Sequence, residues 1–176
     1  MRESPEDVET RLGEAASGLN RAIADIRNYI LNLTHRVGEV TGLREAAESL
    51  AREYGRSTTP GLVPLTITID IDDDASTVVP AEQRIEIIQV PREALANAVR
   101  HARAANITIS GQLERGHLVL RVADDGVGFD VTAGSAEGHH GLRNMTNRAR
   151  MLDGHLDFES APGRGTTLML DLPLSG

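Results

Sequence analysis

The stretch Arg92–His101 constrains the fold and function of this chain more than any other. Read as a helix with about 3.6 residues per turn, it places four polar side chains on one stripe: Glu93, Asn97, Arg100 and His101. A carboxylate and an amide one turn apart can hold a hydrated divalent cation, and the arginine and histidine that follow can donate to phosphate. A solvated helix could carry the same residues by chance, so this stretch alone leaves that alternative open.

Two later stretches place glycines where the chain must turn sharply. Residues 122–129 read VADDGVGF, which predicts a strand that ends in an acid-Gly-x-Gly turn. Residues 138–145 read GHHGLRNM, which predicts a glycine pair that opens a helix. Together with the polar stripe, these stretches form an ordered set of three motifs.

The order of the three motifs resembles the N, G1 and G2 boxes of the GHKL ATPases, a superfamily that includes gyrase, MutL and sensor histidine kinases. The residues around the boxes, REALANAVRHA, DDGVGFD and GHHGLRNM, resemble those of the sensor histidine kinases that partner NarL-type response regulators. The resemblance covers about residues 5–174. It implies a Bergerat-type fold that binds ATP together with Mg²⁺.

The resemblance also implies a role for each residue of the boxes. Asn97 matches the Mg²⁺ ligand, since this cation prefers oxygen and bridges phosphates. Glu93 matches the general-base position, where a kinase would use it to orient or deprotonate the acceptor imidazole. Asp124 matches the acceptor for the exocyclic amine of adenine, and Gly126 and Gly128 match glycines that let the backbone approach the ring.

Other matched positions complete the implied site. The further ATP-binding residues are Arg100, His101, Gly138, Gly141, Leu142 and Thr166. The two glycines would place free amides at a helix N-terminus, where the dipole favours phosphate. His101 could instead be a helix-end histidine bonded to backbone, and Thr166 a plain strand threonine. Arg143 and Arg148 are candidates for contact with the γ-phosphate, for interdomain salt bridges or for surface ion pairs.

The composition excludes several other kinds of site. All 18 basic residues are arginine, so a P-loop, which needs Gly-Lys-Ser/Thr, is excluded. The absence of cysteine excludes disulfides and thiolate zinc sites, and it fits the reducing cytoplasm. A net charge of −8 argues against nucleic-acid binding. No apolar run reaches the roughly 20 residues that span a bilayer, so we expect a cytoplasmic protein without membrane contact in this part.

Residues 5–36 read as one long amphipathic helix with a heptad-like apolar seam. The sequence LNRAIADIRNYILNL within it resembles the second helix of the kinase dimerisation hairpin. None of the six histidines is followed by an acid, as the family's phosphoacceptor histidine is. We therefore expect residues 1–40 to be the second hairpin helix with a hinge and residues 41–176 to be the catalytic ATP-binding domain. The acceptor would lie upstream, so the isolated chain should not phosphorylate itself.

The remaining sequence predicts helices and strands of one domain. Strands are expected over residues 65–71, 106–112, 117–124, 155–160 and 166–173, and helices over 43–54, from 80 through the polar stripe, and over 140–153. Pro91 predicts a bend or break, and Gly154 predicts a C-cap. The sum is an α+β fold, a two-layer α/β sandwich whose mixed, mainly antiparallel sheet has helices on one face, preceded by the long N-terminal helix.

Several local features have a second interpretation. Residues 129–137 would form a short lid that closes over nucleotide. The adjacent His139 and His140 diverge on an opening helix, which disfavours a zinc site. The acids Asp70 and 72–74 lack the glycine and distal glutamate of a calcium loop, so a solvated turn is expected.

These features together imply the catalytic portion of a two-component sensor histidine kinase. In a homodimeric intact kinase it would bind Mg-ATP and transfer the γ-phosphoryl to a histidine, for relay to an aspartate of a NarL-type response regulator. One alternative is an anti-sigma-factor serine kinase of the same fold, against which the heptad-like seam argues. Another is a nucleotide-gated dimerisation module without transferase activity.

Overall fold

The computed structural model describes residues 42–55, 65–131 and 140–174, which all belong to one unit that spans Val40–Gly176. The helix predicted over residues 5–36, the domain boundary near residue 40 and residues 132–137 of the predicted lid lie outside the described residues. These three features stay predictions.

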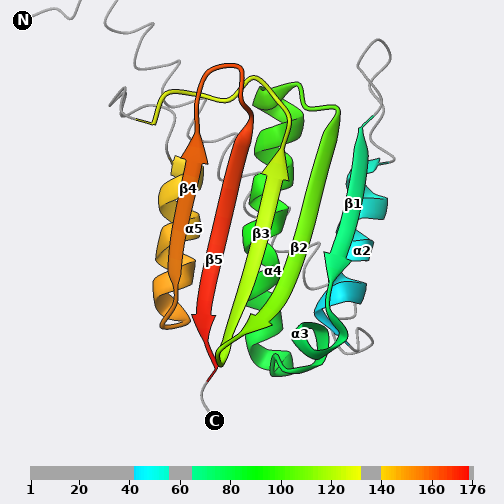
Figure 1. The fold of residues 1–176 in the computed structure, drawn as a ribbon, viewed down its shortest axis with the longest axis vertical. Coiled ribbons are helices and arrows are strands. Elements are labelled where there is room, and N and C mark those ends of the chain that lie inside the picture. Colours follow the sequence, from blue (N-terminus) through cyan, green and yellow to red (C-terminus); the bar gives the residue numbers. More distant parts are fainter. Residues whose placement is uncertain (1–41, 56–64, 132–139, 175–176) are drawn as a thin grey trace, which may run out of the picture. The chain divides into compact units, whose positions relative to one another are not determined.

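Five strands form one mixed sheet in the order β1-β2-β3-β5-β4 (Figure 1). Their bounds are β1 Thr66–Ile71, β2 Asn106–Glu114, β3 His117–Asp124, β4 His155–Ser160 and β5 Thr166–Pro173. β1 pairs parallel with β2, and all other pairings are antiparallel. The register places Asp124 opposite both Ile107 and Thr166. The mixed, mainly antiparallel sheet predicted from the sequence is therefore confirmed.

The longer helices of the described residues lie on one face of this sheet (Figure 1). The helical elements are α2 Leu43–Gly55, α3 Asp73–Thr77, α4 Ala81–Asn97, the π-helical turn η1 Ala98–Ala102 and α5 His140–Met151. In Figure 1, α4 lies behind the central strands, α2 behind β1, and α5 behind β4 and β5. This arrangement confirms the predicted two-layer sandwich.

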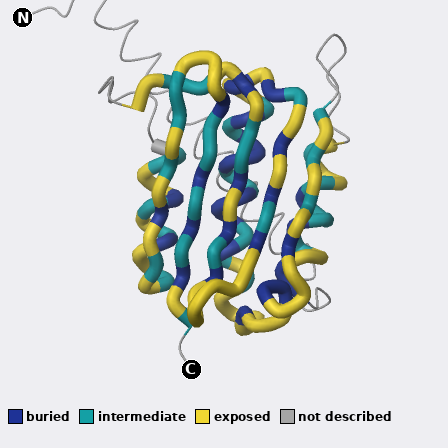
Figure 2. The backbone as a smooth tube through the Cα atoms, in the orientation of Figure 1, coloured by how far each residue is buried: buried dark blue, intermediate teal, exposed yellow. Residues whose placement is uncertain are grey.

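The core lies between the two layers, because alternate strand residues face the helices (Figure 2). The buried hydrophobic side chains of the three central strands are Ile107, Ile109, Leu118, Leu120, Val122, Leu168, Leu170 and Leu172. Ile87, Leu95 and Met145 meet them from the helices. Each fully buried side chain of this size contributes about 1.5–3 kcal/mol. This layer therefore fixes the strand ends on which the candidate site is built.

Of the bend or break predicted at Pro91, the break is wrong, because helix α4 continues through this residue. A proline removes one backbone hydrogen bond from a helix interior. Pro91 is buried, and its neighbours Val90 and Leu95 are core residues, so packing offsets that loss. The irregular part of the helix lies later, where η1 follows α4 directly.

The acidic segment after β1 forms the short helix α3 instead of the predicted turn. Ser76 of α3 is buried, and its hydroxyl accepts a hydrogen bond of 3.0 Å from the backbone N–H of Arg44. The Arg44 side chain forms an ion pair of 2.9 Å with Asp73. Helix α3 therefore caps the first turn of α2, a contact that no local sequence pattern indicates.

The end of α5 differs from the predicted glycine cap. The helix ends at Met151, and the left-handed residue is Asp153, with a φ of 55°. The Gly154 N–H donates to the Ala149 carbonyl at 2.8 Å, as in a Schellman motif. Gly154 is needed for packing, because a Cβ there would lie 2.2 Å from Leu172 Cδ2.

Candidate functional site

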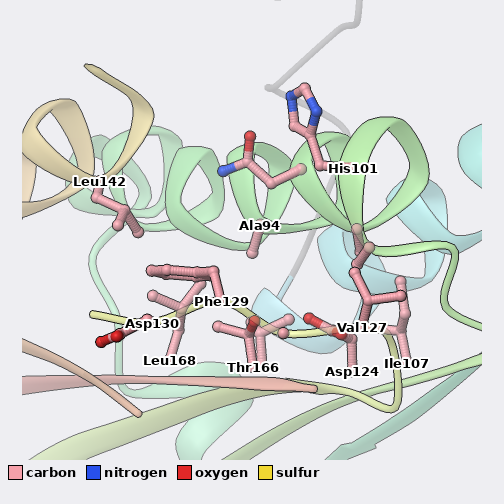
Figure 3. Close-up of a pocket in the computed structure, with 15 residues that line it drawn as sticks. Ala94, His101, Ile107, Asp124, Val127, Phe129, Asp130, Leu142, Thr166 and Leu168 are labelled. Carbon is pink, nitrogen blue, oxygen red and sulfur yellow. The ribbon is translucent and has the colours of Figure 1, made fainter. Parts of the chain in front are cut away.

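A cavity of about 420 Å³ lies between the α4–η1 helix and the ends of β2, β3 and β5 (Figure 3). Six residues predicted to bind the nucleotide line it: Asn97, His101, Asp124, Gly128, Leu142 and Thr166. Figure 3 shows Asp124, Val127 and Ile107 toward one end of the cavity and Leu142 toward the other. Segments far apart in the sequence thus meet in one cavity.

The other predicted site residues lie around this cavity or outside the described residues. Glu93 precedes Asn97 by one helical turn, and both approach the start of α5. A Cβ on Gly141 would lie 2.6 Å from Glu93 Oε1 and 3.3 Å from Asn97 Nδ2. Arg100 is exposed on η1, outside the cavity lining. Gly138 is not among the described residues.

The Asp124 carboxyl lies at the end of β3 and faces the cavity (Figure 3). Its Oδ1 accepts a hydrogen bond of 2.9 Å from the N–H of Gly126. Burial raises the pKa of this carboxyl, and hydrogen bonds from Gly126 and Thr166 oppose the rise. Asp124 is therefore a polar group placed among apolar walls, suited to fix the orientation of a ligand.

Two glycines let the loop after β3 pack closely against its neighbours. A Cβ on Gly126 would lie 2.5 Å from the carbonyl oxygen of Ala102. A Cβ on Gly128 would lie 2.1 Å from the carbonyl oxygen of Ala161, and the φ of Gly128 is 59°. The acid-Gly-x-Gly turn is therefore held between η1 and the β4–β5 hairpin, in a conformation that side chains would obstruct.

Asp125 is exposed, and it has a structural role. Its carboxylate accepts hydrogen bonds of 2.8 Å from the backbone N–H groups of Ala105 and Asn106, and one of 2.7 Å from Asn106 Nδ2. These hydrogen bonds, those from Asn106 first, lower the pKa of Asp125. The two adjacent acids therefore differ: Asp125 holds the start of β2, and Asp124 faces the cavity.

The turn η1 continues the helix that carries the polar stripe, and it contacts the loop after β3. The turn is followed by Arg103 in the left-handed conformation, with a φ of 51°. The carbonyl oxygen of Ala102 accepts a hydrogen bond of 2.8 Å from the N–H of Val127. Single π-helical turns in α-helices occur frequently at functional sites. Because this turn depends on a tertiary contact, the sequence does not predict it.

Sequence reasoning missed most of the apolar lining of the cavity. The missed residues include Ile107, Val122, Val127, Phe129 and Leu168, together with the exposed acid Asp130. For two of these residues, the position in the sequence relative to a predicted site residue could have indicated that they line the cavity. Phe129 follows the second glycine of its turn, and Leu168 lies two residues after Thr166, on the same face of β5.

Arg148, one of the two arginines considered on α5, forms an ion pair. Arg148 pairs with Glu86 of α4, and both side chains are 40% exposed. This geometry confirms the surface ion-pair interpretation for Arg148. Arg143 is exposed on the same helix.

The described residues offer a divalent cation few ligands of their own. Among them, no three His, Cys, Asp or Glu side chains gather as a metal site. The amide of Asn97 and the carboxylate of Glu93 both lie close to the position that a Cβ on Gly141 would take. These oxygen groups suit Mg²⁺, which keeps several waters and is bound together with substrate phosphates. The residues present therefore fit this cation.

Comparison with known proteins gives an independent result. Residues 82–176 match the family model described as "Histidine kinase-, DNA gyrase B-, and HSP90-like ATPase". The sensor histidine kinase LiaS of Bacillus subtilis is 29% identical over 95% of this chain and 42% of its own length. The nitrate/nitrite sensor protein NarQ of Escherichia coli is 28% identical over 96% of this chain and 29% of its own length.

Solved structures agree with this comparison. The blue-light activated histidine kinase of Erythrobacter litoralis EL346 has a TM-score of 0.59 and 26% identity, over 74% of this chain and 40% of that chain. The present chain thus spans less than half the length of each of these three relatives. No helix among the described residues is long and apolar enough to cross a membrane. The family match extends over more than half of the sequence and includes Asn97, Asp124 and Thr166, so this chain belongs to the histidine kinase-, DNA gyrase B- and HSP90-like ATPases.

Proposed function

We propose that this chain is the ATP-binding catalytic portion of a two-component sensor histidine kinase. The observation that carries the proposal is the single cavity lined by Asn97, Asp124 and Thr166, which come from α4, β3 and β5. In this proposal Asp124 accepts a hydrogen bond from the exocyclic amine of adenine. The apolar walls near Ile107 and Leu168 enclose the base.

The phosphates would lie toward the approach between α4 and Gly141. Asn97 would hold Mg²⁺, which when bound neutralises the charge of the phosphates. His101 and Arg100 would donate to phosphate oxygens. These residues contribute mainly by positioning the nucleotide and by stabilising charge.

Phosphoryl transfer would require a histidine acceptor of the intact kinase. An imidazole nitrogen would form a bond to the γ-phosphorus while the bond between the γ-phosphorus and the β,γ-bridging oxygen breaks, and ADP would leave. Glu93 would orient the imidazole or take its proton. The phosphoryl group would then pass to an aspartate of a NarL-type response regulator, in a homodimeric, cytoplasmic kinase.

The test measures Mg-ATP binding by isothermal titration calorimetry for the wild type and Asp124→Asn. The substitution is expected to abolish binding, because the neutral amide of asparagine lacks the negative charge with which the carboxylate accepts a hydrogen bond from the exocyclic amine of adenine. Asp157→Asn, on an exposed residue of β4, is the matched control and should bind as the wild type does. Equal binding by Asp124→Asn would contradict the proposal.

The melting temperature of Asp124→Asn shows whether this variant has lost nucleotide binding alone or has also lost its fold. Burial raises the pKa of Asp124, so the folded protein disfavours the ionised carboxylate at neutral pH. Asp124→Asn should therefore leave the melting temperature at pH 7 unchanged or higher. Any gain should disappear as the pH falls below the ordinary pKa of the carboxyl, where the wild type is also neutral.

The acceptor is tested separately from nucleotide binding. When a dimerisation hairpin with a histidine is joined to the chain, radiolabelled ATP should label that histidine, and a receiver domain should then remove the label. Binding of ATP without any transfer would favour the nucleotide-gated module. Transfer to a serine of a sigma-factor antagonist would favour the serine kinase.

A further inference from the structure

Ser160, the last residue of β4, joins the loop after β3 to the β4–β5 hairpin. Its Oγ accepts a hydrogen bond of 2.9 Å from the backbone N–H of Phe129. The same hydroxyl donates a hydrogen bond of 2.9 Å to the carbonyl oxygen of Gly165, and it lies 3.1 Å from Thr166 Oγ1. Ser160 does not itself line the cavity, but two of these partners, Phe129 and Thr166, do.

The Ser160 contacts lead to Asp124 through Thr166. Thr166 lies directly opposite Asp124 in the β3–β5 register, and its hydroxyl hydrogen-bonds the Asp124 carboxyl. Figure 3 shows Phe129, Thr166 and Asp124 on the same side of the cavity, opposite α4. A continuous path of polar contacts therefore runs from the Phe129 amide to the carboxyl that would bind adenine.

The number of protons on the two hydroxyl groups determines which group donates in each hydrogen bond of this path. Each hydroxyl carries one proton, so Ser160 can donate either to Gly165 or to Thr166. When Asp124 is ionised, Thr166 donates to the carboxylate, and the Ser160 hydroxyl can then turn its proton from the Gly165 carbonyl to Thr166. Hydrogen bonds in a chain that ends on a charge are stronger than the same bonds between neutral groups. The path therefore favours the ionised form of Asp124.

We propose that Ser160 is a positioning residue for adenine recognition, which orients the Thr166 hydroxyl toward Asp124 and keeps this carboxylate ready to accept the exocyclic amine. The inference rests on the proposed function, because it assumes that Asp124 contacts adenine. It adds a residue that touches no ligand and acts through Thr166.

Other ionisable groups near Asp124 must be separated from this effect. They are Asp125 directly after β3, Asp130 and His101, which line the same cavity, and Glu93 and Arg164 on the adjoining α4 and β4–β5 hairpin. Those near the phosphates act equally on ATP and on inosine triphosphate, which has a carbonyl oxygen in place of the amine. The ratio of the two affinities therefore isolates the contact of Asp124 with the base.

The experiment measures the ratio of the dissociation constants for Mg-ITP and Mg-ATP between pH 5 and pH 8. We compare wild type, Ser160→Ala and Ser160→Thr, which keeps a hydroxyl. Ser160→Ala is expected to reduce the preference for ATP about three- to tenfold at the acidic end, the scale of one hydrogen bond. The pH at which the preference is lost should move upward, because Asp124 loses support for its ionised form. Ser160→Thr should restore the wild-type profile.

The controls separate the possible outcomes. Ser110→Ala removes a hydroxyl from the middle of β2 and should behave as the wild type does. If Ser160→Ala does not fold, Ser160→Cys replaces it, since a thiol is of similar size but hydrogen-bonds weakly. An unchanged ratio at every pH, or an equal loss of both affinities, would overturn the role of Ser160. Lack of any ATP preference in the wild type would instead contradict the proposed function.

Discussion

Single glycines decide how closely the segments of the site approach each other. Gly141 is the clearest case, because it stands at the start of α5 and faces two predicted catalytic residues. The position that its Cβ would take is 2.6 Å from Glu93 Oε1 and 3.3 Å from Asn97 Nδ2. Gly126 and Gly128 have the same role in the loop after β3, where a Cβ would meet the backbone carbonyl oxygens of Ala102 and Ala161. These glycines contribute no side-chain chemistry. They allow the backbone to approach the neighbouring segments closely.

Substituting Gly141→Ala should weaken Mg-ATP binding about tenfold, equivalent to about 1.4 kcal/mol, while the fold is kept. The added Cβ would displace the flexible end of Glu93, which costs the fold little but moves the site residues. Alanine is also favoured over glycine in a helix by about 1 kcal/mol, so the free energy of unfolding should not fall. Calorimetry and urea unfolding measure the two effects.

The control for this substitution is Gly55→Ala at the end of α2. No atom lies within 4 Å of the Cβ position of Gly55, so both affinity and stability should stay close to those of the wild type. Wild-type ATP affinity in Gly141→Ala would show that α5 does not approach the polar stripe as closely as described.

At the scale of elements, helix α2 is fastened to α4 beside the candidate site. Arg92 Nη1 donates to both carboxylate oxygens of Glu53, at 2.9 and 3.0 Å. The Arg92 side chain is 12% exposed, whereas Glu53 is 38% exposed. The Tyr54 hydroxyl also reaches the Arg92 carbonyl at 3.4 Å. Since Arg92 precedes Glu93, these contacts fix the part of α4 that enters the site.

Glu53→Ala is expected to lower the free energy of unfolding by about 1–2 kcal/mol, because it leaves the largely buried Arg92 charge without its partner. Glu48→Ala is the matched control on the same helix. It removes an exposed i,i+4 pair with Arg52 at 3.7 Å, which contributes about 0.3–0.5 kcal/mol. Chemical unfolding should also show that Arg92→Ala adds little to Glu53→Ala. Equal losses for Glu53→Ala and Glu48→Ala would contradict a buried pair.

The elements that the sequence predicted correctly are those with local causes. Residues 155–160 and 166–173 alternate and flank a glycine-rich turn, and both strands have the predicted bounds. The missed features depend on partners distant in sequence. The turn η1 is held by the hydrogen bond between Val127 and Ala102. Ser76 caps α2 through Arg44, which lies 32 residues earlier in the sequence. The continuity of α4 at Pro91 likewise depends on burial, which a helix-breaking rule does not include.

At the scale of the whole molecule, the candidate site follows from the order of strands in the sheet. The pairing of β3 with β2 and β5 brings Asp124 next to Ile107 and Thr166. The helix layer then places Asn97 over these strand ends. The motifs could be recognised in the sequence because each is continuous. Ser160 could not, because its contacts exist only when the β4–β5 hairpin packs on the loop that contains Phe129.

The most direct test of this convergence is a titration of the isotope-labelled chain with Mg-ATP, followed by amide NMR. We expect the amides around Asn97, Asp124, Gly141 and Thr166 to shift together, with one common dissociation constant. The amides of the distant β2–β3 turn, Arg115 and Gly116, should stay unchanged. Shifts confined to one of these segments, or separate dissociation constants for different segments, would contradict the claim that they bind a single nucleotide.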